Sequence, residues 1–250
     1  MFRAFIRRNR AICTRLERWL PNARGHTYRL YAETVANALR EPGVRLVLDV
    51  GGGKTCAFAE GRERNDGARI VAVDISAEEL AGNRIVDARL AADLTAGLPL
   101  RQASVDVIAS RSVLEHLDDL EAFVRDAARV LRPGGAFIHW VPGKYAPFAV
   151  INRMMPHALA RRVLYYVEPE VKGICGFRAV YDQCYPSALR RLFERHGFEI
   201  TVMRPSYYQS SYYAFFLPFY LLSSLYEIVL QALGVQDLCA HVLIAARRKE

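Results

Sequence analysis

Short apolar runs alternate with helical patterns along residues 44–141, and this alternation is the feature that most restricts the fold. The apolar runs, each of strand length, lie at 44–50, 69–74, 88–94, 105–109 and 136–141. The segments with a helical pattern lie at 54–60, 76–86 and 118–131. Apolar strands separated by helices are typical of a parallel sheet covered on both faces. We therefore expect an α/β fold with helices on both faces of a mostly parallel sheet.

The pattern changes after residue 141. Residues 142–185 are rich in Pro, Tyr and Arg and are too long for an ordinary connection, so we expect an irregular insert there. The segments expected after it are a helix at 186–196, strands at 198–204 and 238–246, and a second insert at 205–236. The two inserts are the parts of the chain that a simple alternating fold does not account for.

The N-terminal segment carries most of the net charge. The chain has a formal charge of +8, and residues 1–24 hold seven arginines and one glutamate, a net charge of +6. Apolar residues recur at three- and four-residue spacing along 2–20, which predicts a basic amphipathic helix that Pro21 ends. The composition is 52% hydrophobic and 24% charged, which excludes collagen-like, disordered and disulfide-scaffold classes. The body of the chain is therefore a nearly neutral globular protein.

The cysteines and histidines show no spacing typical of a metal site or a disulfide framework. Five scattered cysteines without a C-x-x-C pair indicate reduced thiols in a cytoplasmic compartment. The six histidines are separated and form no H-E-x-x-H, so no metal is expected. The N-terminus has no uninterrupted apolar run, so a secretory signal peptide is not expected.

A glycine turn follows the first apolar run, in the segment Val47–Thr55. Glycines allow a tight turn and let the backbone approach a ligand closely. A phosphate-binding G-x-x-x-x-G-K-[ST] loop would need glycine at Leu48, so that reading fails. A dinucleotide G-x-G-x-x-G motif would need glycine at Cys56, which weakens that reading. A third pattern, D-x-G-x-G, matches Asp49, Gly51 and Gly53.

With this pattern the chain resembles the class I S-adenosylmethionine-dependent methyltransferases. The resemblance covers residues 44–141 well and 186–246 in outline, and Thr55 stands where the family has a third glycine. The segment Leu131–Gly135 is similar to the turn that the family places before its fifth strand. The resemblance implies a Rossmann-like sheet of seven mostly parallel strands, with an antiparallel last strand and helical inserts. It also implies S-adenosyl-L-methionine as the cofactor.

The resemblance assigns the cofactor site to the carboxyl ends of four strands. Asp74, which ends the second run, would bind both ribose hydroxyls, because a carboxylate accepts from two O–H donors. Asp93 and Leu94 would meet the adenine. The full set of cofactor residues expected is Asp49, Gly51, Gly52, Gly53, Asp74, Ile75, Asp93, Leu94, Ser110 and Arg111. The alternative is that these acids only cap helices in a fold of the same type.

Methyl transfer is an in-line displacement that requires alignment and deprotonation of the acceptor. Nucleobase amino-methylases carry [DN]-P-P-[YF] after the fourth strand, where this chain has Ser110–Val113, so a hydroxyl on a small molecule, glycan or lipid is favoured. Carbon and carboxyl acceptors remain open. His116 is the candidate catalytic base, since the family places a histidine there and imidazole titrates in the useful range. The first insert offers further candidates for which packing is the alternative: His157, Tyr165, Tyr166, Tyr181 and Tyr185.

The second insert contains an apolar stretch that indicates contact with a membrane surface. Tyr212–Leu222 is too short to span a bilayer, which needs about 20 residues. Six tyrosines lie nearby, as at membrane interfaces. Residues 1–24 and 205–233 together predict peripheral membrane contact through basic and apolar residues. A lid or a homodimer interface is the alternative for the apolar stretch, and packing on the domain is the alternative for the N-terminal helix.

These observations predict an N-terminal helix at 1–24 and a methyltransferase domain at 25–250, with inserts at 142–185 and 205–236. The expected function is O-methylation of an amphipathic small molecule, glycan or lipid-linked acceptor at the cytoplasmic, inner membrane face. A nucleic acid partner is not expected, since the body has no basic excess. The alternatives are an RNA-modifying methyltransferase and a non-catalytic protein that keeps the S-adenosylmethionine fold.

Overall fold

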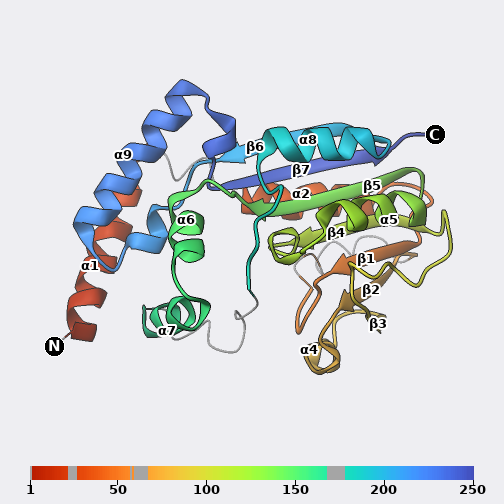
Figure 1. The fold of residues 1–250 in the computed structure, drawn as a ribbon, viewed down its shortest axis with the longest axis horizontal. Helices are drawn as coiled ribbons and strands as arrows, with labels where there is room; N and C mark the ends of the chain where they lie inside the picture. The colour runs from red at the N-terminus through yellow and green to blue at the C-terminus, as the bar shows by residue number, and fades with distance from the viewer. Residues whose placement is uncertain (1, 22–26, 57, 59–66, 168–177) are drawn as a thin grey trace.

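A single seven-stranded sheet forms the centre of the computed structural model, which describes residues 2–21, 27–56, 58, 67–167 and 178–250 (Figure 1). The strands are β1 (Leu46–Val50), β2 (Arg69–Asp74), β3 (Ala88–Ala91), β4 (Val105–Arg111), β5 (Leu131–Pro142), β6 (Phe198–Ser206) and β7 (His241–Arg248). Their order in the sheet is β3-β2-β1-β4-β5-β7-β6. The first five pair in parallel, and β7 is antiparallel to both of its neighbours. The predicted sheet and its antiparallel last strand are confirmed.

Helices cover both faces of this sheet. One face packs on α5 (Leu120–Val130) and α8 (Pro186–Arg195), whose apolar residues form one core cluster with the strands. The other face packs on α2 (Tyr28–Leu39), which contributes Tyr31, Val35 and Leu39 to a second cluster. The short helix α4 (Ala77–Gly82) follows β2 and is capped by the Ser76 hydroxyl. Of the predicted helix at 54–60, residues 57, 59 and 60 lie outside those described, and the described residues 54–56 form a turn and a bend rather than a helix.

The two inserts are helical and lie together beyond one end of the sheet (Figure 1). The first contains α6 (Pro147–Met154) and α7 (His157–Val167), which confirms the helical inserts that the resemblance implied and corrects the irregular segment expected from composition. Pro147 occupies the first turn of α6, where it needs no N–H donor, and so starts a helix rather than breaking one. The second contains the 3₁₀ turn η4 (Ser210–Tyr213), α9 (Leu217–Leu233) and the 3₁₀ turn η5 (Gln236–Leu238). The N-terminal helix α1 (Phe2–Glu17) lies beside α9 (Figure 1).

Several element boundaries differ from the sequence expectation, among them the end of β3 and the start of β5. β3 ends at Ala91 rather than at residue 94, because the Asp93 carboxylate accepts a hydrogen bond from the Thr95 N–H at 2.9 Å and closes a turn. The segment Leu131–Gly135, expected as a turn before β5, is the start of β5 itself. It contains an irregularity opposite Val105 and Val107, and Gly134 there has a φ of +77°. Four described cysteines are free and buried, and Cys175 lies outside the described residues.

Candidate cofactor and acceptor site

The register of the strands brings the predicted acids to one edge of the sheet. Val50 pairs with Val73 of β2 and with Ser110 of β4, and Asp74 pairs with Ala91 of β3. The carboxyl ends of these four strands therefore meet, and ligands of open α/β sheets bind at such an edge. The short 3₁₀ helix η2 (Leu114–His116) follows β4 at the same edge.

The glycine turn after β1 has no room for side chains. Gly51 has a φ of +70°, and a Cβ atom there would collide with Val113. A Cβ atom on Gly52 would lie 2.7 Å from the Ala72 Cβ atom and 3.0 Å from the Asp49 carbonyl oxygen. The Asn83 side chain donates to the Gly52 carbonyl at 2.9 Å, which fixes the turn against the chain after α4. The turn is a backbone surface that a ligand can approach closely. Thr55 lies in a bend beyond it.

Asp74 is half-buried at the end of β2 and faces the glycine turn. Its Oδ2 atom accepts from the Gly53 N–H at 3.1 Å and its Oδ1 atom accepts from the Ser76 N–H at 2.9 Å. These two bonds hold the carboxylate plane, and each oxygen keeps a second lone pair for a hydroxyl donor. Ile75 is 63% exposed beside it and presents an apolar surface at the same edge. The pair fits a ribose ring and the purine attached to it.

Asp49 is a buried carboxyl group behind the glycine turn. Burial, the largest cause, raises the pKa of Asp49 to about 7, against the opposing effect of the Arg111 guanidinium. Its Oδ2 atom has no hydrogen-bond partner among the described residues. A buried acceptor without a donor is costly, and a cationic ligand would supply the missing partner. The ammonium group of a methionine moiety has the required charge and donors, so the site fits S-adenosylmethionine.

The remaining predicted cofactor residues differ in their exposure. Asp93 is exposed, and its hydrogen bonds with the Thr95 hydroxyl and N–H lower its pKa, so it is ionised at neutral pH. Leu94 is buried within the core. Ser110 is fully buried, and its hydroxyl shares a hydrogen bond of 2.6 Å with the Nδ1 atom of His139. Only the backbone of Ser110 is therefore left to meet a ligand, and its assignment stays a prediction.

Arg111 leaves the end of β4 on the side of the sheet that α2 covers. Its guanidinium hydrogen-bonds to the Tyr28 hydroxyl and lies 5.0 Å from the centre of the same ring. The buried Tyr31 lies close enough to Arg111 and Asp49 to feel both charges, and its hydroxyl has no hydrogen-bond partner among the described residues. Sequence reasoning missed both tyrosines because α2 precedes the resemblance. Their only signal was their helical spacing on the segment before the first strand.

His116 is held in a defined orientation at the end of η2. Its Nδ1 atom lies 3.0 Å from the Arg178 carbonyl oxygen, which can only accept, so Nδ1 carries the proton in the neutral ring. The Nε2 atom then presents a lone pair. Burial lowers the pKa of His116, so the ring is neutral at pH 7 and can accept a proton.

Glu115, which was not among the residues expected in the site, is buried beside His116. Its Oε1 atom lies 3.8 Å from the His116 Nε2 atom, and its Oε2 atom has no hydrogen-bond partner among the described residues. Burial raises the pKa of Glu115 to about 8, so the carboxyl group is protonated at neutral pH. Its backbone carbonyl accepts from the Val180 and Tyr181 N–H groups, which ties η2 to the first insert.

The other candidate bases have different surroundings. Tyr181 is buried, and burial raises its pKa above the usual range, which makes it a poor base. Tyr185 lies under Lys144, whose ammonium is 5.9 Å from the ring centre, and Tyr166 is 61% exposed. The side chain of His157 is not described. Among the described residues, no group of three or more His, Cys, Asp and Glu side chains is arranged to hold a metal ion.

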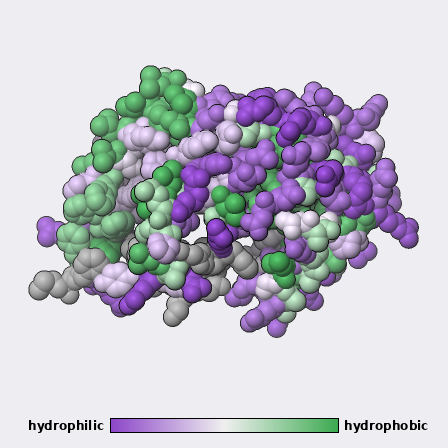
Figure 2. Space-filling model, viewed as in Figure 1, coloured by the Kyte–Doolittle hydropathy of each residue, from purple (hydrophilic) through white to green (hydrophobic). Residues whose placement is uncertain are grey.

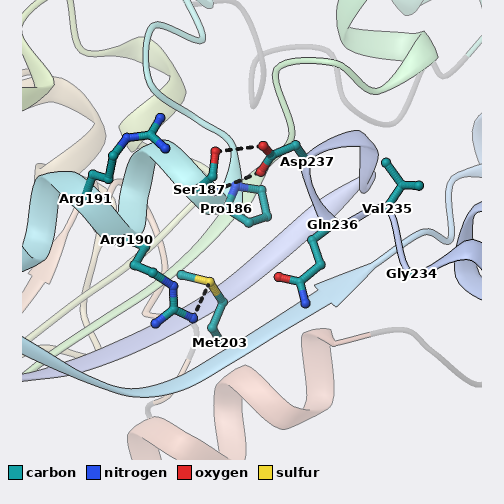
Figure 3. Close-up of a pocket in the computed structure, with 9 residues that line it drawn as sticks. All are labelled: Pro186, Ser187, Arg190, Arg191, Met203, Gly234, Val235, Gln236 and Asp237. Atoms are coloured by element: carbon teal, nitrogen blue, oxygen red, sulfur yellow. Dashed lines mark hydrogen bonds between the residues drawn. The ribbon is translucent and has the colours of Figure 1, made fainter.

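A separate pocket of about 400 Å³ lies at the β6 edge of the sheet (Figure 3). β6 is four strands away from β1 in the sheet. Ser187 donates its hydroxyl and its N–H to the Asp237 carboxylate, and an Arg190 N–H reaches the Met203 sulfur at 3.5 Å. Ser187 and Asp237 are thus bonded to each other, and none of the predicted site residues lines this pocket.

The fold and the glycine turn define a Rossmann-like protein, and β1, β2 and β4 end at the edge where open α/β sheets bind ligands. A family model described as a methyltransferase domain matches residues 48–139. These residues run from the Leu48–Gly53 turn to His139 on β5. Residues 48–139 thus resemble a methyltransferase domain, and the seven-stranded sheet has the class I methyltransferase fold.

Comparisons with individual proteins agree with this assignment. A probable S-adenosylmethionine-dependent methyltransferase of Mycolicibacterium smegmatis is 51% identical over 49 residues, which is 20% of this chain and 19% of that protein. A putative sarcosine dimethylglycine methyltransferase of Galdieria sulphuraria has a TM-score of 0.57 at 16% identity, over 89% of this chain and 85% of its own. The geranyl diphosphate C-methyltransferase of Streptomyces coelicolor has a TM-score of 0.56 at 16% identity, over 87% and 78%.

The curated relative and the solved structures support different conclusions about this chain. The curated relative is matched over about a fifth of its length, so its activity as a whole protein does not pass to this chain by similarity alone. The solved structures are less than 25% identical and show the fold alone. The site itself must therefore carry the argument about chemistry.

Proposed function

We propose that the protein transfers a methyl group from S-adenosylmethionine to a hydroxyl of an amphipathic small molecule, glycan or lipid-linked acceptor. Two carboxyl groups at this edge carry the proposal. Asp74 accepts a hydrogen bond from the glycine turn, and the Oδ2 atom of the buried Asp49 has no hydrogen-bond partner among the described residues. The first suits two ribose hydroxyls, and the second suits the ammonium group at the other end of the cofactor. The bound cofactor supplies an electrophilic methyl group on a sulfonium.

The acceptor would approach from the inserts, because η2 and the first insert are joined at this edge. Tyr181 and Val180 bond to the Glu115 carbonyl, and Arg178 bonds to His116. A hydroxyl acceptor within reach of the His116 Nε2 atom would lose its proton to the neutral imidazole as the methyl group is transferred. Two similar structures are named for methyltransferases of small substrates, sarcosine or dimethylglycine and geranyl diphosphate, which supports a small-molecule acceptor.

We also propose that the methyl transfer takes place at the inner face of the membrane. The apolar inserts that adjoin the acceptor side, together with the arginines of α1, suit an acceptor held in a membrane leaflet. Among the residues that the structure describes, none of the helices combines the length and hydropathy needed to cross a bilayer. Contact with the membrane would therefore be peripheral.

Calorimetric titration with S-adenosylmethionine tests the cofactor site. We expect Asp74→Ala to weaken binding at least about tenfold, because a hydrogen bond to a charged group contributes about 1.5–3 kcal/mol. The exposed Glu199→Ala on the edge strand β6 is the matched control and should bind like the wild type.

Two outcomes would contradict the cofactor assignment. One is a wild-type protein that binds no S-adenosylmethionine, and the other is an Asp74→Ala variant of unchanged affinity. Formation of S-adenosylhomocysteine with a total lipid extract as acceptor then separates an enzyme from a non-catalytic binding protein.

A further inference from the structure

The helix α9 has its polarity reversed relative to an ordinary surface helix. Its buried side carries Ser223, Ser224 and Glu227, with exposed fractions of 8%, 2% and 0%. Its outward side is apolar, and the large hydrophobic residues exposed there are Phe219, Leu221, Leu222, Leu225, Val229 and Leu233. A helix that meets only water buries its apolar stripe, so this arrangement indicates an apolar environment on the outside.

Hydrogen bonds fix α9 in this orientation. The buried Glu227 carboxylate accepts from the Gln209 N–H at 3.1 Å, from the Ser210 hydroxyl at 3.3 Å and from the Ser223 hydroxyl at 3.0 Å. Rotating the helix to bury its leucines would move Glu227 outward and break the bonds from Gln209 and Ser210, which lie outside α9. The outward leucines are therefore a property of the folded protein and not of a loosely attached helix.

The basic helix α1 packs against the same insert through its less charged side. The Asn9 side chain accepts from the Leu217 N–H at 2.9 Å, the Cys13 thiol donates to the Ala214 carbonyl at 3.7 Å, and the Phe5 and Phe216 rings lie 6.3 Å apart. Ile6, Asn9 and Cys13 are buried in this contact. Five arginines of the N-terminal segment stay exposed: Arg3, Arg7, Arg8, Arg15 and Arg18.

Figure 2 shows hydrophobic residues gathered over α9, at the upper left of the molecule, and a much more hydrophilic surface over the sheet end. The apolar surface thus lies at the end of the molecule that carries the inserts. α6 adds exposed apolar residues at the same end, Ile151 and Met154, the latter 80% exposed.

We propose that the outward face of α9 and the exposed arginines of α1 form one docking surface for an anionic lipid bilayer. The α9 leucines would enter the boundary between headgroups and acyl chains, while the arginines would meet lipid phosphates. This inference deepens the proposed function. It rests on that function only for the idea that the docked protein meets its acceptor at the membrane.

Charge favours a bilayer over a second copy of the chain. In a symmetric dimer through α9, the arginines of one copy would approach those of the other, and like charges repel. The outward side of α9 carries no acidic residue that could compensate, because Glu227 is its only one and is buried. An anionic membrane supplies both the apolar environment and the opposite charge.

Co-flotation of the full chain with vesicles tests the proposal. Vesicles of phosphatidylcholine alone are compared with vesicles that contain 30% phosphatidylglycerol, about one charged lipid in three, without cofactor or acceptor. We expect the wild type to bind the anionic vesicles, and Leu222→Gln/Leu225→Gln to bind them at least tenfold less. Leu30→Gln on α2, 37% exposed, is the control for a lost surface apolar residue.

A second set of variants isolates the charge. Arg3→Gln/Arg7→Gln/Arg8→Gln, which keeps Arg15 and Arg18, should lose most of the preference for anionic vesicles, whereas Arg101→Gln/Arg125→Gln/Arg191→Gln, three exposed arginines elsewhere, should keep it. Circular dichroism and S-adenosylmethionine titration establish that each variant is folded. Since flotation needs no turnover, a failure here leaves the methyl-transfer proposal standing, and a failure of cofactor binding leaves this one standing.

Three results would overturn the docking surface. The first is a wild type that does not float with anionic vesicles, or leucine variants that float like it. The second is sedimentation of the wild type as a dimer that Leu222→Gln/Leu225→Gln converts to a monomer, which would make the surface a self-interface. The third is arginine-dependent binding of RNA by a protein that ignores vesicles.

Discussion

At the scale of single residues, burial gives neighbouring groups different protonation states at one pH. Glu115 and His116 are adjacent in the chain, yet the desolvation that raises the pKa of the carboxyl group lowers that of the imidazole. Both are therefore neutral at pH 7. An imidazole that is neutral and bonded at Nδ1 to a carbonyl is prepared to take a proton at Nε2. The His116 ring does not need a charged neighbour to keep this orientation.

His116 gives a prediction with a definite pH dependence. A base must be unprotonated, and a pKa below 6.5 means that protons bind only as the pH falls past that value. At saturating S-adenosylmethionine, methyl transfer to a lipid extract should therefore decline as the pH falls below 6.5. His116→Ala should lower the rate about 10²–10⁴-fold, the usual contribution of a general base.

S-Adenosylmethionine affinity is the control for this prediction, since His116 is not among the residues expected to hold the cofactor. His116→Gln keeps a polar side chain but no imidazole, and it should lose activity as His116→Ala does. A His116→Ala enzyme with wild-type turnover, or a wild-type rate that rises as the pH falls, would show that another group takes the proton.

Sequence patterns could predict the location of residues that directly follow or end a parallel strand. Asp49 and Asp74 are examples, because parallel strands carry whatever follows them to a common edge. Glu115 could not be predicted in the same way. Its burial depends on segment 178–181, which folds back over η2 from more than 60 residues along the chain. The same is true of Ser110, whose hydroxyl is used by His139 on the neighbouring strand.

At the scale of elements, the strands were located from the sequence, whereas the inserts were expected to be helical without the positions of α6 and α7. Apolar runs are enough to locate β1, β2 and β4, since a parallel strand is buried on both faces. α6 and α7 have no such signal, because their polar and apolar residues are arranged by contacts within the insert. The stripe of Ser223, Ser224 and Glu227 was visible in the sequence, but the expected side for polar residues is the outside. Only the bonds from Gln209 and Ser210 show that the stripe faces inward.

Glu227 therefore gives a prediction at the scale of one element. Glu227→Ala leaves the Gln209 N–H and two serine hydroxyls without their acceptor inside the protein, and each lost bond to a charged group contributes about 1.5–3 kcal/mol. We expect amide exchange over residues 206–233 to accelerate more than about tenfold, since 1.4 kcal/mol corresponds to a factor of ten.

The exchange of β1 and β4 in this variant should change less than that of α9, because the bonds that Gln209, Ser210 and Ser223 make to Glu227 lie within the second insert. Gln231→Ala, on the exposed part of the same helix, is the matched control and should leave the exchange of α9 unchanged. Uniform acceleration across the sheet would instead mean that the second insert and the sheet unfold as one unit.

At the scale of the whole molecule, the cofactor site and the proposed docking surface use different parts of the chain. The glycine turn, Asp49 and Asp74 belong to the sheet, whereas the apolar and basic surface belongs to α1 and α9. Both core clusters are built without any residue of α1, although Ile6 and Cys13 are buried against the second insert. We therefore propose that residues 1–24 are an accessory segment and that residues 25–250 fold as the methyltransferase domain.

Deleting residues 1–24 tests this division. The shortened chain should bind S-adenosylmethionine within about twofold of the wild type, since none of the residues expected to hold the cofactor is removed. Its thermal midpoint should fall by only a few degrees, because a loss of 1 kcal/mol lowers the midpoint by about 2–4 °C in a chain of this size. It should also lose its preference for anionic vesicles. The full-length Arg3→Gln/Arg7→Gln/Arg8→Gln variant separates the charge from the packing, since it removes arginines but keeps Ile6, Asn9 and Cys13 in place. A deletion that abolishes cofactor binding while the triple variant retains it would show that α1 belongs to the domain rather than to its membrane contact.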